Sequence, residues 1–127
     1  MQKTAIRIRD IAFTGYPVKN MERARHFYES ILHLMPSMVS EDGAWVEYDL
    51  NGSAFFIGNF EEWKPSKNGP MIAFEVDEFE QTVQILKDEN VKMFGDVIET
   101  PGCWMGIFAD PDGNCFTIHK IKPGRGG

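Results

Sequence analysis

The chain has 127 residues, of which 43% are hydrophobic and 25% are charged, and its formal net charge is −6. The acidic balance argues against nucleic acid as a partner, because such binding needs clustered Lys and Arg. No apolar run reaches the roughly 18 residues of a membrane span, and two cysteines are too few for a disulfide framework. We therefore expect a cytoplasmic globular protein that binds neither nucleic acid nor membrane.

The first half of the chain is predicted to form one strand, one helix and three more strands. Apolar, β-branched and aromatic residues over 10–18 predict the first strand. Asn20 is a typical helix N-cap, and apolar residues recur at helical spacing over Met21–Leu32. Three short strands are expected within 36–60, and Asn51-Gly52 is a strong hairpin signal between two of them.

The second half repeats this order after the segment "NFEEWKPSKNGP", which has two prolines and is predicted to be a polar linker. "MIAFEV" over 71–76 predicts a strand, Glu78–Asp88 a helix, and the residues up to 121 three more strands. The last two strands are joined by the sequence Asp-Pro-Asp-Gly over 110–113. Proline presets the turn dihedral and Gly113 permits a positive φ, so this segment predicts a hairpin turn.

The order β-α-β-β-β therefore occurs twice, which indicates an internal repeat. Val18 and Val76 both precede a helix (76 − 18 = 58), and Gly52 and Gly113 both lie in the last hairpin (113 − 52 = 61). One such module is small to stand alone, whereas two can share a core and curl their sheets around a cleft. We expect a single α+β domain over 1–127, made of βαβββ modules at 8–60 and 69–121 with curved mixed sheets.

Three segments resemble the vicinal oxygen chelate superfamily, which includes glyoxalase I, extradiol dioxygenases and bleomycin-resistance proteins. They are "YPVKNMERARHFYESIL", "MIAFEVDEFEQTV" and "FADPDGNCFTIHK", and the likeness spans nearly all of the chain from about Ile11 to Lys120. The resemblance implies this fold, but it is a poor guide to the reaction because the fold hosts many functions.

The resemblance also implies a divalent metal in the cleft, held by His, Gln or Glu from the first and last strands of each module. Those positions fall on Phe13, Phe56, Met71 and Thr117. Phenylalanine has no lone pair to donate, and the soft sulfur of methionine does not suit Mg, Mn or Fe(II). We therefore expect neither a metal nor another cofactor at this site.

Two acids and a histidine are the polar candidates. His119 alternates with Thr117 along one strand, and it is either a hydrogen-bonded residue at a rim or dimer contact, or a ligand contact or general base. Glu75 shares the parity of Met71 and is either a solvated or paired acid, or a general base in a dry pocket. Glu47, like Glu75, is an acid within an apolar strand.

The tryptophans are core or dimer anchors, or walls on which a ligand stacks. The complete set of candidate ligand-binding residues is Phe13, Trp45, Glu47, Phe56, Met71, Glu75, Trp104, Thr117 and His119.

These observations predict a small-molecule-binding protein of the bleomycin-resistance type that lacks the family's metal site. The excess of aromatic residues predicts a homodimer. Two enzyme hypotheses remain open, so whether the protein is an enzyme is undecided. One is a metal-dependent lyase, isomerase or dioxygenase, which needs a different strand register or unusual ligands such as Glu47, Glu75 and His119. The other is a metal-free enzyme with Glu75 or His119 as its base.

Overall fold

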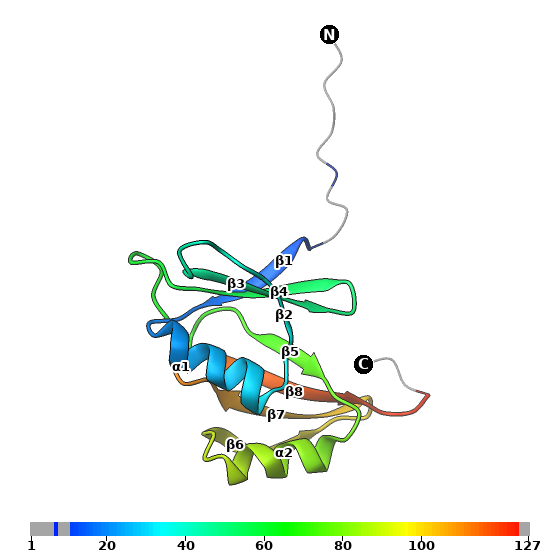
Figure 1. Cartoon of the computed structure of the whole chain (residues 1–127). Coiled ribbons are helices and arrows are strands. Elements are labelled where there is room, and N and C mark those ends of the chain that lie inside the picture. The colour runs from blue at the N-terminus through cyan, green and yellow to red at the C-terminus, as the bar shows by residue number, and fades with distance from the viewer. Residues whose placement is uncertain (1–6, 8–10, 125–127) are drawn as a thin grey trace.

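The computed structural model describes residue 7 and residues 11–124. The predicted start of the first module, at residue 8, lies outside the described residues. The chain forms two βαβββ modules, each with a four-stranded mixed sheet, as predicted (Figure 1). The first sheet has the order β1-β4-β3-β2, with β1 parallel to β4. Its module consists of β1 (Phe13–Pro17), α1 (Met21–Arg25), η1 (His26–Ile31), β2 (Pro36–Val39), β3 (Trp45–Leu50) and β4 (Ser53–Gly58).

The second sheet repeats this topology with the order β5-β8-β7-β6 and a parallel pair of β5 and β8. The first sheet lies in the upper part of Figure 1, and the second sheet with α2 lies below it. The elements of this module are β5 (Ile72–Glu75), α2 (Phe79–Asp88), β6 (Met93–Glu99), β7 (Cys103–Ala109) and β8 (Cys115–Ile121).

The helix predicted over Met21–Leu32 begins as an α-helix and continues as a π-helix. The Asn20 side chain accepts a hydrogen bond of 2.9 Å from the N–H of Arg23, which confirms the N-cap. From His26 the turns widen, and the N–H of Leu32 donates to the carbonyl of Phe27, five residues earlier. Apolar spacing alone does not distinguish these two kinds of turn, because both bury a stripe along one face.

Strand alternation divides each sheet into two faces, one of which packs on the helices. The helix-side residues of both sheets belong to one core cluster, so the two modules share a single core. Phe27 of η1 lies 5.7 Å from Phe116 of β8 between ring centroids, and Phe55 of β4 lies 5.6 Å from Phe74 of β5. The opposite face of each sheet is therefore directed away from this core.

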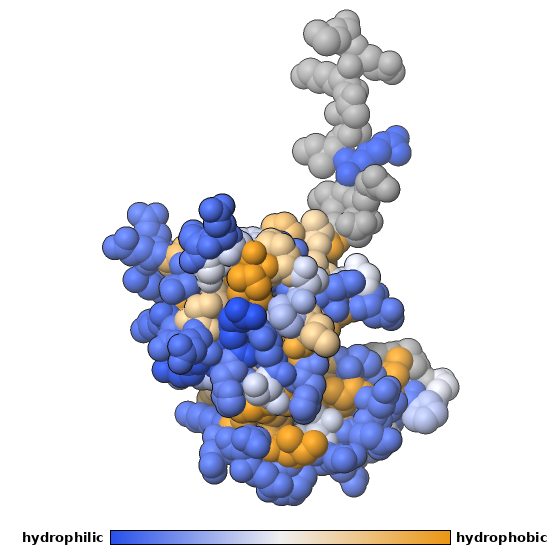
Figure 2. Space-filling model, in the orientation of Figure 1, coloured by the Kyte–Doolittle hydropathy of each residue, from blue (hydrophilic) through white to orange (hydrophobic). Residues whose placement is uncertain are grey.

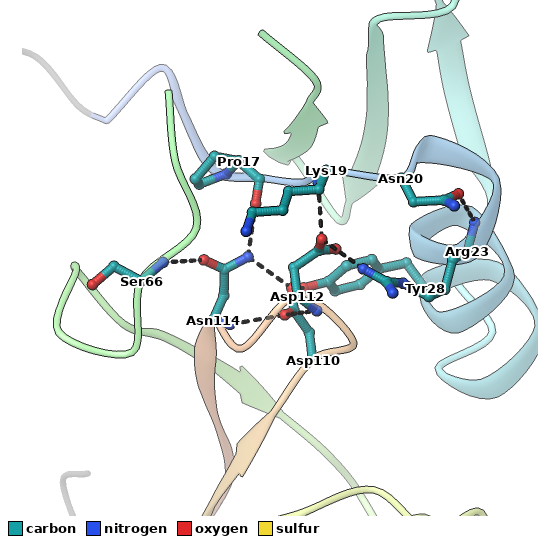
Figure 3. A network of polar contacts seen from close by, with 9 residues as sticks. All are labelled: Pro17, Lys19, Asn20, Arg23, Tyr28, Ser66, Asp110, Asp112 and Asn114. Carbon is teal, nitrogen blue, oxygen red and sulfur yellow. Dashed lines mark hydrogen bonds and ion pairs between the residues drawn. The ribbon is translucent and has the colours of Figure 1, made fainter. Parts of the chain in front are cut away.

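The turn over Asp110–Gly113 joins the two modules (Figure 3). Asp110 accepts hydrogen bonds of 2.9 Å from the N–H groups of Asp112 and Asn114, and Gly113 has a φ of 90°. The other carboxylate oxygen of Asp110 accepts a bond of 2.7 Å from the hydroxyl of Tyr28 in the first module. The predicted hairpin turn is confirmed. Both carboxylate oxygens of Asp110 accept hydrogen bonds from other groups of the protein.

Asn114 and Asp112 reach the first module as well. The side-chain amide of Asn114 donates to the carbonyl of Pro17 at 2.8 Å. Asp112 accepts from the N–H of Lys19 at 2.8 Å and pairs with the guanidinium of Arg23 at 2.9 Å, as Figure 3 shows. These bonds fix the end of the last hairpin to the segment between β1 and α1.

Buried tyrosine hydroxyls complete this junction. Burial raises the pKa of Tyr28, and the neighbouring Asp110 raises it further. Burial also raises the pKa of Asp110, against the lowering effect of the bonds from Asn114 and Tyr28. Tyr16 donates to the carbonyl of Cys115, and burial raises the pKa of Tyr16 to about 12. Both tyrosines therefore stay protonated at neutral pH and act as donors between the modules.

Candidate functional site

Three aromatic rings cover the side of the first sheet that faces away from the core. The indole of Trp45 stacks on the ring of Phe56, with centroids 3.8 Å apart and planes 9° apart. Phe13 meets both rings edge to face, at 5.8 Å from Trp45 and 5.3 Å from Phe56. Phe13 is 51% exposed, whereas Phe56 is buried beneath its neighbours. We call Phe13, Trp45 and Phe56 the aromatic face.

Two glycines allow these rings to lie close to the sheet. Gly15 of β1 pairs with Phe56, and a methyl group on Gly15 would lie 2.2 Å from the Phe56 ring. A methyl group on Gly58 would lie 2.8 Å from the ring of Phe60, which itself lies 6.0 Å from Trp45. Trp63 extends the rings further, with its centroid 5.5 Å from that of Phe56.

Glu47 places a carboxylate beside the aromatic face. It lies two residues after Trp45 on β3 and pairs with Phe56 in the sheet register. The indole N–H of Trp45 donates to the Glu47 carboxylate at 2.7 Å, so one oxygen has a fixed position. Both residues are among the candidates predicted from the sequence, and the structure brings them into contact.

The matching side of the second sheet carries a more polar group, formed by Met71, Glu75, Thr117 and His119. We call these four residues the polar face. Thr117 pairs with Ala73 and His119 with Glu75 in the register, so the predicted common parity is confirmed. The Thr117 hydroxyl donates to the sulfur of Met71, and Met71 is 49% exposed.

Glu75 fixes the imidazole of His119. One carboxylate oxygen of Glu75 lies 2.5 Å from Nδ1 of His119, and the other accepts from the N–H of Ile121 at 2.8 Å. Partial burial would raise the pKa of Glu75, but the bonds from Ile121 and His119 outweigh it and lower the pKa. Because an ionised Glu75 only accepts, Nδ1 carries a hydrogen and Nε2 remains for another partner.

Trp104 lies on the other side of the second sheet from the polar face. It pairs with Lys120 in the register, whereas His119 pairs with Met105. Trp104 is partly buried against the shared core, and the ammonium group of Lys122 lies 4.9 Å from its ring centroid. It therefore joins neither candidate face.

The donor set at the family's ligand positions does not fit a divalent metal. Phe13 lies against Phe56 in the first module, and Met71 is bonded to Thr117 in the second. These four residues supply one neutral hydroxyl, one thioether and no carboxylate or imidazole. Within residues 11–124, no group of three or more His, Cys, Asp and Glu side chains gathers at one point.

A separate groove of about 940 Å³ opens between the two modules. Leu32, Leu34, Phe55 and Phe74 line it, together with Glu75 of the polar face. No residue of the aromatic face belongs to its lining.

Figure 2 shows a largely hydrophilic surface in this view, with apolar side chains gathered mainly in the lower half, over the second module. Among the described helices, none is long and apolar enough to cross a membrane.

Four contributors to the aromatic face were not among the predicted residues: Gly15, Gly58, Phe60 and Trp63. Phe60 and Trp63 belong to the segment that was predicted to be a polar linker. Acids and prolines surround these two aromatic residues in the sequence, so the segment reads as polar. A glycine inside a strand was the available signal for Gly15, since it often marks a close approach of another group.

A family model for the glyoxalase/bleomycin resistance protein/dioxygenase superfamily matches residues 10–118. The chain belongs to this superfamily. The repeated βαβββ order and the mixed sheets agree with that membership. No curated protein matches the sequence.

Solved structures of similar fold come from several bacteria. A putative glyoxalase family protein from Bacillus anthracis has a TM-score of 0.78 and 19% identity, and the alignment covers 94% of this chain and 100% of that one. TnmS3, an antibiotic binding protein from Streptomyces sp. CB03234, has a TM-score of 0.74 and 19% identity, and the alignment covers 93% of this chain and 100% of that one. The fosfomycin resistance protein FosX from Mesorhizobium loti has a TM-score of 0.70 and 16% identity, and the alignment covers 92% of this chain and 96% of that one. At these identities the likeness concerns the fold.

Proposed function

We propose that the protein binds a small, flat organic molecule on the aromatic face without the family's divalent metal. The observation that carries this proposal is the replacement of hard donors by stacked rings at the superfamily's ligand positions. Phe13 and Phe56 are in edge-to-face contact at 5.3 Å where the family resemblance implies ligands. An aromatic surface of this kind contributes stacking and apolar burial, whereas a hydrated ion gains little there.

The aromatic face is a better candidate for the ligand than the groove between the modules. Phe13 is half exposed although it is a large apolar side chain, and Met71 is similarly exposed on the polar face. Large apolar side chains that are exposed on a folded protein indicate a binding surface when they gather in one place. TnmS3 is an antibiotic binding protein of the same fold, which makes small-molecule binding plausible for this chain.

We further propose a homodimer in which the aromatic face of one chain meets the polar face of a second chain. Within one chain the two faces lie on sheets that share a core on their other sides. No hydrogen bond or ring contact joins the two faces among the residues that the structure describes. A cleft lined by both faces therefore needs a second copy of the chain.

A metal-free enzyme is the second candidate, and the contact between Glu75 and His119 favours it. A carboxylate at 2.5 Å from Nδ1 orients the imidazole and fixes which ring nitrogen is free. Nε2 of His119 is then able to accept a proton from a bound molecule. In this version the aromatic face binds the substrate and the polar face supplies the base.

The binding proposal is tested by a fluorescence or calorimetric screen of flat heteroaromatic molecules. Hits are then measured with Phe13→Ala and Met71→Ala. Each substitution is expected to weaken binding by roughly tenfold, since about 1.4 kcal/mol of stacking or burial is removed.

The matched control is Ile85→Ala, because Ile85 on α2 is 45% exposed and belongs to neither face. If Phe13→Ala and Met71→Ala both leave binding intact, the ligand occupies another site and the proposal is wrong. Loss of binding in Leu34→Ala alone would move the ligand to the groove between the modules.

A further inference from the structure

We propose that the ligand of the aromatic face is a planar organic cation, with Glu47 as its charge partner. This inference rests on the proposed function, because it assigns a ligand class to that same face. The Glu47 carboxylate is held at 2.7 Å from the indole N–H of Trp45, next to the stack of Trp45 on Phe56. A ligand lying against these rings would therefore meet a fixed negative charge.

The charges of the first sheet all have one sign. Its four strands, Phe13–Pro17, Pro36–Val39, Trp45–Leu50 and Ser53–Gly58, contain no Lys, Arg or His. The two charged residues in them are Glu47 and Asp49, which have the same parity on β3. A carboxylate or phosphate on the ligand would be repelled here and would find no cation on these strands to bind it.

Glu47 is also free of a cationic partner within the described part of the chain. The four salt bridges there involve other acids: Asp112, Glu29, Glu75 and Glu99. Among the described residues, its carboxylate accepts one hydrogen bond, from the neutral indole of Trp45, which leaves its negative charge uncompensated. Without a partner inside the protein, a ligand cation would complete the ion pair at the aromatic face.

Aromatic rings add to this preference. A cation near the face of an indole or phenyl ring is attracted by the ring quadrupole, and the effect grows when water is excluded. Phe13, Trp45 and Phe56 supply such rings around the carboxylate, and Met38 pairs with Glu47 at the neighbouring position of β2. The combination of rings, a thioether and one acid favours a flat cation over a neutral molecule of the same shape.

The polar face agrees with this assignment if it covers the ligand in the proposed dimer. Its two polar side chains with titratable groups are Glu75 and His119, whose Oε1 and Nδ1 atoms are 2.5 Å apart. Lys120 of the same strand pairs with Trp104, on the opposite side of the sheet. The second face thus adds a further carboxylate and no lysine or arginine from β5 or β8.

The test compares three probes that share one ring system: N-methylacridinium as the cation, 9-methylacridine as the neutral form at pH 8, and acridine-9-carboxylate as the anion. Their affinities are measured by fluorescence titration with the full chain. The cation is expected to bind at least tenfold more tightly than the neutral probe, and the anion more weakly than either. The preference for the cation should shrink as NaCl is raised, because salt screens charges that remain near solvent.

Glu47→Gln isolates the charge, since a Gln side-chain oxygen still accepts from the Trp45 N–H. This variant should bind the cation as weakly as the neutral probe and leave the neutral affinity unchanged. Glu80→Gln removes the same charge from the exposed side of α2 and should change nothing.

Two failures are distinguishable. Equal affinity for cation and neutral probe, with both weakened by Phe13→Ala, would overturn the cation assignment and leave the proposed function standing. Absence of binding by all three probes at millimolar concentration, or binding that is insensitive to Phe13→Ala, would overturn both.

Discussion

The ring of Phe56 lies directly over Gly15, where a side-chain methyl group would come within 2.2 Å of it. The indole of Trp45 stacks on the ring of Phe56 in turn. The position of the aromatic face therefore depends on the absence of a side chain at one residue of β1.

Gly15→Ala should displace Phe56 and disorder the aromatic face. We expect a loss of about 1–3 kcal/mol in the free energy of unfolding, as for other overpacked sites. Ligand hits should bind at least tenfold more weakly. Urea unfolding and titration measure both effects.

Gly69→Ala is the control for this substitution, because a methyl group there meets its nearest atom at 3.7 Å and no positive φ is required. It should be neutral in stability and binding. A stable Gly15→Ala protein with unchanged affinity would contradict the role given to the aromatic face.

Asn114→Ala should loosen the junction between the modules. Asn114 is 1% exposed, donates to the carbonyl of Pro17 and accepts from the N–H of Ser66 at 3.2 Å. Its removal leaves buried groups without partners, which costs about 2–4 kcal/mol in the free energy of unfolding. Asn68→Ala is the matched control, because Asn68 is exposed and takes part in a hydrogen bond only through its backbone N–H. Equal stability of the two variants would show that the hairpin contacts contribute little.

Glu75 should make stability depend on acid pH. Its pKa is lowered in the folded state, so its contribution is fully present above the unfolded value of about 4.5. That contribution is lost as pH falls through the lower folded pKa, when Glu75 takes up a proton and releases His119 and the N–H of Ile121. Urea unfolding between pH 7 and pH 3 should show a smaller decline for Glu75→Gln than for the wild type. If the free energy of unfolding falls equally with pH in both proteins, the pKa of Glu75 does not differ between the folded and unfolded states.

Much of the fold was predictable because it depends on local chemistry. Asn51 and Gly52 both have positive φ, 53° and 93°, which is what the Asn-Gly hairpin signal predicts. Alternation along β8 placed Thr117 and His119 on one side, and the register confirms it. These features follow from dihedral preferences and from the two-residue period of a strand.

Trp104 illustrates how the offset of the repeat decides which face a residue occupies. It lies 104 − 45 = 59 residues after Trp45. In the sheets, Trp45 pairs with Gly58, and the residue 61 positions after Gly58 is His119, which pairs with Met105. The structural equivalent of Trp45 is therefore Met105, at an offset of 60. A difference of one residue turns the side chain to the other face of the strand.

Phe60 and Trp63 were missed for a different reason. They follow β4 in an irregular segment without periodicity, so nothing local indicates that their rings turn back onto the sheet. Their positions depend on contacts with Trp45, Phe56 and Gly58, which are formed only in the folded chain.

The proposed dimer predicts that two defective variants complement each other. If one site combines the aromatic face of one chain with the polar face of another, Phe13→Ala and His119→Ala each damage every site of their homodimers. After the two proteins are unfolded and refolded together, about one site in four should be intact through random pairing in twofold-symmetric dimers. Titration of the mixture against each variant alone measures this recovery. Absence of recovery together with a monomer in light scattering would contradict the shared site.

The last prediction concerns the metal. Phe13, Phe56 and Met71 supply no hard donor at the family's ligand positions, and the hydroxyl of Thr117 is bonded to Met71. An ion at this point would be held mainly by water, and it would lose part of its hydration by entering an aromatic surface. We expect purified protein to carry no stoichiometric Zn, Ni, Mn or Fe by elemental analysis. Chelator should leave the melting temperature unchanged, and added Ni²⁺ or Mn²⁺ should not raise it. A tightly held metal whose removal lowers the melting temperature would promote the metal-dependent enzyme hypothesis, with Glu47, Glu75 and His119 as the first ligands to substitute.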